Sequence, residues 1–172
     1  MLTREELMEL IPEAVGELQI SIPVVISDEE PDIRIRQEDG TLAESSIMTD
    51  TVAAYQPEDR VIVLYINWLV RFMQYVEQKQ GNGKTIKRRG AKEFLKFFLI
   101  HENRHAEQHY FLIGFFQYKE ELALHAFLQL YSGAYVTNPL ELDAVEAQKG
   151  NVRDIASVMI QIMQEKGIIV AA

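Results

Sequence analysis

The sequence predicts one α+β domain over residues 1–172 that is mostly helical and has a small mixed sheet near its N-terminus. Short runs rich in β-branched residues, separated by proline and acidic residues, precede residue 66. Most of the chain after that point has apolar residues at helical spacing. A chain of 172 residues can bury a sizeable core, and 48% hydrophobic with 25% charged residues is an ordinary globular composition.

The first third of the chain is expected to combine a helix with short strands. Thr3 offers an N-cap ahead of an acidic first turn, and Pro12 would kink or shorten the helix that follows. Residues 20–26 and 32–36 are β-rich runs that predict two strands. Residues 52–65 predict two more strands around a Pro-Glu-Asp turn.

Five helices are expected in the remainder, at residues 67–76, 91–115, 118–131, from 139 onward and 152–166. Gly114 could interrupt the second of them. Asn138 and Pro139 supply an N-cap and a first helical residue for the fourth. A basic cluster lies between the first two helices, at Lys84, Lys87, Arg88, Arg89 and Lys92. We interpret it as a solvated loop leading into a helix, with contact to an anionic partner as the alternative.

Charge and composition exclude several classes of function. The net charge of −9 disfavours nucleic acid as a partner. The chain has no cysteine, which excludes disulfides, thiolate metal ligands and a cysteine nucleophile. The start of the chain does not resemble a signal peptide, and the longest apolar run, residues 61–70, is too short to span a bilayer. We therefore expect a cytoplasmic protein with no membrane partner, and the sequence does not set its oligomeric state.

The motif that carries chemistry is His101-Glu102-Asn103-Arg104-His105, which reads HExxH within a predicted helix. A helix places residues i and i+4 on one face, so His101 and His105 can bind the same metal ion. Zn²⁺ suits this pattern best, with Glu102 beside it as a general base. The mostly apolar residues 94–100 predict that the histidines are partly buried. The alternative is a chance motif on a metal-free helical protein.

A catalytic zinc site needs a third protein ligand, for which Glu141 is our choice. It lies in the first turn of the helix that follows Pro139, 36 positions after His105, and a helical hairpin could return it to the first helix. The alternative is that Glu141 only stabilises its helix N-terminus electrostatically. Asp143 and Glu146 are weaker candidates.

Two further histidines are interpreted differently. His101 and His109 are about 12 Å apart along a helix axis, too far for one metal ion. His125 could be a metal ligand, a transition-state donor or a core histidine, and we favour the core.

With these residues the chain resembles the zincin metallopeptidases, specifically small gluzincins. The matching segments are His101-Glu102-x-x-His105 and Glu141-Leu142-Asp143-Ala144, because many such families follow HExxH with a Glu-x-x-Ala whose glutamate binds zinc. The resemblance implies a zincin-like fold, an HExxH active-site helix and residues 61–65 as the strand that borders the cleft and pairs with a peptide. The chain departs from the family pattern by having Asn103 and Arg104 inside the motif.

A second departure is Val145, where gluzincins often have an aspartate that supports a histidine ligand. Asp143 or Glu146 is the expected replacement in supporting His101.

These observations predict a zinc-dependent peptidase that acts on a peptide or protein substrate. Zn²⁺ would be held by His101, His105 and Glu141, and Glu102 would move the proton. Tyr135 is the expected donor to the developing oxyanion, with Tyr131 and His125 as substitutes. The alternative is a zincin-like metal-binding protein that acts as a regulatory or protein-binding module. The basic loop would support that role, whereas Glu102 argues against it.

Overall fold

The computed structural model of the chain is an α+β protein dominated by helices. It describes residues 2–29, 34–36, 42–44, 52–80 and 82–170. The chain forms two compact units. Unit 1 comprises Met1–Ala54 and Ile62–Phe98, and unit 2 comprises Tyr55–Val61 and Leu99–Ala172.

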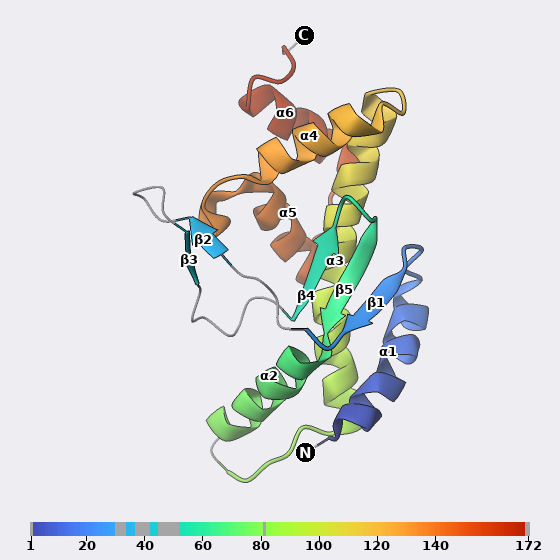
Figure 1. Ribbon diagram of the computed structural model, residues 1–172, viewed down its shortest axis with the longest axis vertical. Coiled ribbons are helices and arrows are strands. Elements are labelled where there is room, and N and C mark those ends of the chain that lie inside the picture. The colour runs from blue at the N-terminus through green and yellow to red at the C-terminus, as the bar shows by residue number, and fades with distance from the viewer. Residues whose placement is uncertain (1, 30–33, 37–41, 45–51, 81, 171–172) are drawn as a thin grey trace. The chain divides into compact units, whose positions relative to one another are not determined.

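Along the chain the elements follow the predicted order, with a short strand at Leu42–Glu44 and a 3₁₀ turn at Tyr135–Thr137 that the sequence did not predict (Figure 1). They are α1 (Arg4–Leu18), β1 (Val24–Ser27), β2 (Arg34–Arg36), β3 (Leu42–Glu44), β4 (Ala53–Gln56), β5 (Val61–Tyr65), α2 (Ile66–Lys79), α3 (Arg88–Phe115), α4 (Glu120–Tyr131), the 3₁₀ turn η1 (Tyr135–Thr137), α5 (Pro139–Gln148) and α6 (Ile155–Glu165). Of the strand predicted at 32–36, residues 32 and 33 lie outside the described residues.

Helix α1 begins as its sequence predicts. The Thr3 side chain accepts a hydrogen bond from the Glu6 backbone, and the Glu6 side chain accepts one from the Thr3 backbone, which completes a capping box. Pro12 does not shorten the helix, which continues to Leu18. The helix buries one face, made of Leu7, Leu10, Ile11 and Ala14, and burial of this face offsets the backbone hydrogen bond that proline cannot donate.

The three-stranded sheet has the order β1-β5-β4, with β1 and β5 parallel and in register from Val24↔Ile62 to Ser27↔Tyr65. Strand β5 is therefore central, which agrees with the burial of Ile62, Val63 and Leu64. This corrects the expectation that residues 61–65 pair with a peptide, because both sides of β5 are occupied. Strand β4 is the edge strand on that side, within the described residues. Strands β2 and β3 form a separate antiparallel pair.

In unit 1 the basic cluster is partly neutralised by α1. Arg88 lies 2.6 Å from Glu13, and the Lys92 ammonium donates to Glu17. Lys84, Lys87 and Arg89 are exposed. The solvated-loop interpretation fits Lys84 and Lys87, and Arg89 is exposed in the first turn of α3. Arg88 and Lys92 join two helices of the same unit.

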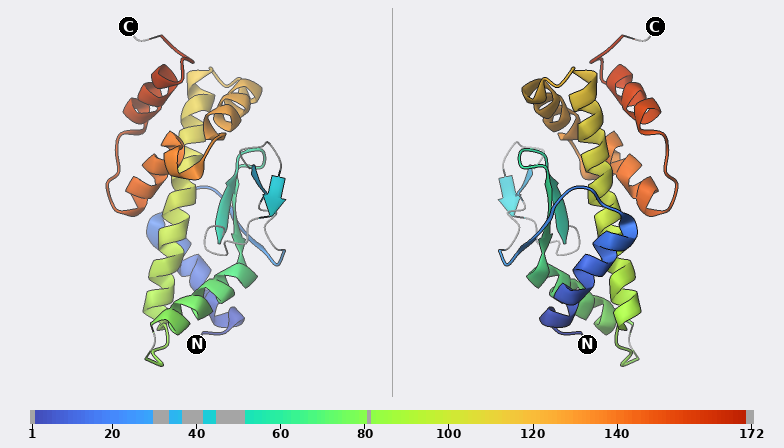
Figure 2. Two further views of the ribbon diagram at one scale, coloured as in Figure 1. Left: turned by 90° about the vertical axis from the view of Figure 1, so that its left-hand side faces the viewer. Right: turned by 90° about the vertical axis from the view of Figure 1, so that its right-hand side faces the viewer.

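In unit 2, α4 and α6 lie on opposite sides of the C-terminal half of α3 (Figure 2). Helix α3 passes through Gly114 without interruption and ends at Phe115. Gln117 and Tyr118 then adopt left-handed backbone angles, with φ of 55° and 65°, and turn the chain into α4. No helix in the described part of the chain has both the length and the apolarity to cross a membrane.

Candidate functional site

The structure brings together His101, His105 and Glu141, the three residues predicted from the sequence to be metal ligands. The Nε2 atoms of His101 and His105 are 3.1 Å apart. Glu141 Oε2 lies 2.9 Å from His101 Nε2, and Glu141 Oε1 lies 3.4 Å from His105 Nε2. All three residues are buried, with exposed fractions of 7%, 1% and 3% respectively. Within the described residues, no other three such side chains come as close.

This cluster fits a tetrahedral zinc ion. Two ligands that each lie about 2.0–2.1 Å from zinc at the tetrahedral angle are about 3.3 Å apart. The three separations between ligand atoms, 2.9, 3.1 and 3.4 Å, scatter around that value. Three protein donors of the nitrogen and oxygen type leave one position open, as catalytic zinc sites do. The donor set and its spacing thus match the group that the motif implies.

Glu141 reaches the histidines because Asn138 fixes the connection between α4 and α5. The Asn138 side chain caps α5 by accepting from the Leu140 backbone at 2.9 Å. Its amide donates to the carbonyl oxygens of Leu130 and Tyr131 at the end of α4, at 3.1 and 2.9 Å. One buried side chain therefore sets the end of α4 and the start of α5, and Glu141 lies in the first turn that follows.

Tyr131 is the closest phenol to the cluster. Its hydroxyl donates a hydrogen bond to Glu141 Oε1, and its ring packs at right angles to His105 with the centroids 5.1 Å apart. Tyr131 keeps 38% of its surface exposed, so it borders the site from solvent. Burial, and then the charges of Glu141 and Glu102, raise the pKa of Tyr131, which keeps its hydroxyl a donor at neutral pH.

Gln108 determines which nitrogen of His105 is available to a metal. The Gln108 amide nitrogen donates to Asp143 at 2.9 Å and to the Leu140 carbonyl at 3.0 Å, and neither partner can donate in return. The amide oxygen of Gln108 consequently faces His105 Nδ1, at 2.9 Å, and accepts its proton. In its neutral form His105 therefore keeps its proton on Nδ1 and offers the lone pair of Nε2 on the side of Glu141 and His101.

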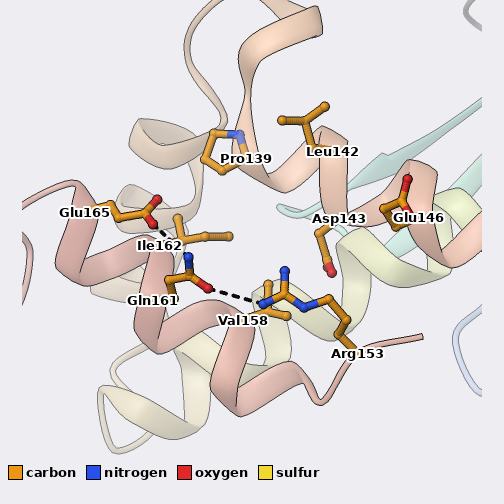
Figure 3. Close-up of a pocket in the computed structure, with 9 residues that line it drawn as sticks. All are labelled: Pro139, Leu142, Asp143, Glu146, Arg153, Val158, Gln161, Ile162 and Glu165. Carbon is orange, nitrogen blue, oxygen red and sulfur yellow. Dashed lines mark hydrogen bonds between the residues drawn. The ribbon is translucent and has the colours of Figure 1, made fainter. Parts of the chain in front are cut away.

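Arg104 and Asp143 form a buried ion pair beneath this arrangement. The Arg104 guanidinium donates to both Asp143 oxygens, at 2.7 and 3.2 Å, and both side chains are nearly inaccessible. It also donates to the Arg153 carbonyl at 2.8 Å and to Glu107 at 2.9 Å. Asp143 borders a cavity of about 180 Å³ between α5 and α6 (Figure 3). The arginine that departs from the usual motif interior is thus the residue that ties α3 to α5.

Burial and hydrogen bonds oppose each other in the ionisation of the cluster. Burial alone would raise the pKa of Glu141, yet hydrogen bonds with His101 and His105 hold that pKa well below its ordinary range. Burial likewise disfavours protonated His105, but its bond with Glu141 and the charge of Glu102 outweigh burial and raise its pKa. A cation bound at this site would take the place of the proton that His105 shares with Glu141.

Glu102 lies beside the ligands without being one of them. Its Oε2 accepts a hydrogen bond from the backbone N–H of Tyr55 at 2.6 Å. Burial raises the pKa of Glu102, while His105 and His101 lower it by a smaller amount, so its affinity for a proton exceeds that of a solvated carboxylate. The strand that faces the base is β4, through Tyr55, and not β5.

The remaining candidates differ in burial and in their partners. His125 is exposed, so its interpretation as a core histidine is wrong: on α4 the buried face is made of Ala123, Ala126, Phe127 and Leu130. Tyr135 lies in η1 with 53% of its surface exposed. Glu146 bonds to Lys149 and Asn151, both at 2.9 Å. Asp143 supports His105 through Gln108, which corrects the expected support of His101.

Sequence reasoning underestimated Tyr131, Gln108 and Arg104. Their roles depend on partners that are 10 to 39 positions away in the chain. The sequence pointed to Arg104 only as an unusual charge inside the HExxH motif, to Gln108 only as a glutamine common in related helices, and to Tyr131 only as a substitute oxyanion donor. The contact of Tyr55 with Glu102 could not be predicted from the sequence, because Tyr55 makes it with its backbone N–H and any residue type could do the same.

No family model matches the chain, and no curated protein or solved structure is similar to it.

Replacing Gln108 with alanine removes the acceptor that fixes the His105 tautomer. We expect zinc affinity to fall about 10–100-fold, the usual effect of losing the partner of a ligating histidine. Competition with a chromogenic chelator measures this affinity. Gln161→Ala, on the exposed side of α6, is the matched control and should bind zinc as the wild type does. Unchanged affinity in Gln108→Ala would show that Gln108 does not orient His105.

Proposed function

We propose that the protein is a zinc-dependent peptidase with a zincin-like active site, in which His101, His105 and Glu141 hold the metal. The observation that carries this proposal is the convergence of these three buried side chains at tetrahedral ligand spacing, with Glu102 next to them and outside the ligand set. A structural metal site has no use for such a base, whereas hydrolysis requires one. Glu102 therefore favours an enzyme over a binding module.

Glu102 and Tyr55 have separate roles in the proposed hydrolysis. When bound, zinc would polarise the scissile carbonyl and make a water molecule acidic enough to attack at neutral pH. Glu102 accepts the proton of the attacking water and later passes it to the leaving amine. Its raised pKa suits both transfers, since it can hold the proton between the two steps. The backbone N–H of Tyr55 keeps the carboxylate in position.

The oxyanion donor is proposed to be Tyr131 rather than Tyr135. Tyr131 already donates to Glu141 and packs on His105, so its hydroxyl is beside the ligands. A phenol that borders the site from solvent can turn toward a substrate carbonyl without crossing the core. Tyr135, on the exposed 3₁₀ turn that leads to α5, is the alternative.

Purified without chelator, the protein should contain close to one zinc ion per chain. His101→Ala and Glu141→Ala should each lose most of their zinc, because each removes a ligand that a four-coordinate site cannot replace. Glu146→Ala is the control, since Glu146 lies on the same helix and bonds only to surface partners. Elemental analysis after dialysis gives the stoichiometry. A wild-type protein that holds no metal after incubation with Zn²⁺ would refute the proposal.

Glu102→Gln should retain zinc but lose peptide hydrolysis, because an amide cannot accept the water proton at neutral pH. The expected loss in rate is at least about a hundredfold. Wild type, variant and chelated wild type are compared on a mixed peptide library, with zinc content measured in parallel. Chelator-sensitive cleavage that persists unchanged in Glu102→Gln contradicts the mechanism. Zinc-loaded wild type that cleaves no peptide favours the protein-binding module.

Tyr131→Phe and Tyr135→Phe separate the two candidate donors. If Tyr131 stabilises the oxyanion, Tyr131→Phe should lower kcat about 10²–10³-fold, as the loss of one oxyanion donor does. Tyr135→Phe should stay close to the wild-type rate. Zinc affinity is measured in both variants, since Tyr131 also bonds to Glu141. The assignment is reversed if kcat falls in Tyr135→Phe alone.

A further inference from the structure

Unit 2 contains a second cavity, one helical turn beyond the metal ligands. It has a volume of about 460 Å³ and lies between the β4–β5 turn, α3 and the start of α4. Its charged lining comprises Glu58, Asp59, Arg60, Glu120 and Glu121, and His109 also lines it. We call this cavity the acidic pocket, because four carboxylates face one guanidinium.

His109 supplies an unsatisfied polar group to the acidic pocket. The ring is 2% exposed, and its Nε2 has no hydrogen-bond partner among the described residues. Its Nδ1 lies 2.9 Å from the Tyr55 hydroxyl. Burial, and then the charge of Arg60, lower the pKa of His109, so the ring is neutral at pH 7. The neutral ring can carry its proton on Nδ1 and donate it to the Tyr55 oxygen, and in that tautomer Nε2 is an acceptor for an N–H group of a ligand.

The acidic pocket already holds one guanidinium group. Arg60 lies 2.6 Å from Glu120, and its guanidinium is 5.9 Å from the centre of the Tyr110 ring. This pair neutralises Glu120 and leaves Glu58, Asp59 and Glu121, which are exposed. A second cationic group with N–H donors would therefore meet three carboxylates and an aromatic nitrogen acceptor.

The acidic pocket is connected to the metal site through Tyr55. The backbone N–H of Tyr55 donates to Glu102, and its hydroxyl meets His109. His109 follows His105 by four residues, which is about 6 Å along the helix axis. An extended peptide advances about 3.3 Å per residue, so a substrate residue one or two positions from the cleaved bond can place its side chain here.

We propose that the acidic pocket binds the basic side chain of an arginine or lysine in the substrate, within two residues of the cleaved bond. This inference rests on the proposed peptidase function and names its substrate class. The contacts expected are carboxylate–cation pairs with Glu58 and Glu121, together with one hydrogen bond to His109 Nε2.

Binding is tested without reference to catalysis. The zinc-loaded protein is titrated with Nα-acetyl-arginine methylamide and with the citrulline analogue, which has the same shape and no charge, and NMR resonances of His109 and Glu121 are followed. Arginine should bind about tenfold more tightly than citrulline, because only the charged group gains from the carboxylates. Glu58→Gln/Glu121→Gln should lose most of this preference. Glu146→Gln/Glu165→Gln changes the net charge equally in the same unit and should retain it.

Equal binding of the two probes by the wild type, or an unchanged preference in Glu58→Gln/Glu121→Gln, overturns the proposal. A parallel assay uses peptides that differ only by arginine or citrulline and is expected to show faster cleavage of the arginine peptide. If both peptides are cleaved at one rate, the peptidase stands and the acidic pocket does not determine its substrates. If arginine binds selectively but no peptide is cleaved, the proposed peptidase fails and the binding site stands.

Discussion

The buried ion pair between Arg104 and Asp143 holds the candidate site together. Arg104 belongs to the helix that carries both histidines, and Asp143 to the helix that carries Glu141, so their two-point contact fixes one helix against the other. Removing one partner of such a pair costs about 3–5 kcal/mol, because the other charge stays buried. Gln108 uses the same Asp143 carboxylate to orient His105. The positions of the three candidate metal ligands thus depend on a contact that contains none of them.

This dependence explains why a carboxylate can be buried next to two imidazoles. An isolated Glu141 with 3% of its surface exposed would gain a proton and lose its charge. Hydrogen bonds from Tyr131 and the histidines keep it ionised instead. A divalent cation that displaced the protons between these groups would meet a carboxylate and two nitrogen lone pairs, the donor types that zinc prefers.

A single residue of β4 links the base to the neighbouring pocket. Tyr55 holds Glu102 with its backbone and His109 with its hydroxyl, so chemistry and substrate recognition would share one support. Burial raises the pKa of the Tyr55 phenol, which keeps it a neutral hydroxyl beside the imidazole. A change in the β4–β5 turn that moved Tyr55 would therefore alter the position of Glu102 as well as that of His109 in the acidic pocket.

The sequence by itself determined most of the elements and the candidate metal ligands. Capping signals at Thr3 and Asn138 and the spacing of apolar residues are local, and HExxH fixes two imidazoles on one face through helix geometry alone. Only the tertiary structure decided which distant residues meet them. The order of the strands, the partner of Arg104 and the exposure of His125 depend on packing between elements far apart in the chain. Such packing is set by the whole core rather than by any local pattern, and so no short motif encodes it.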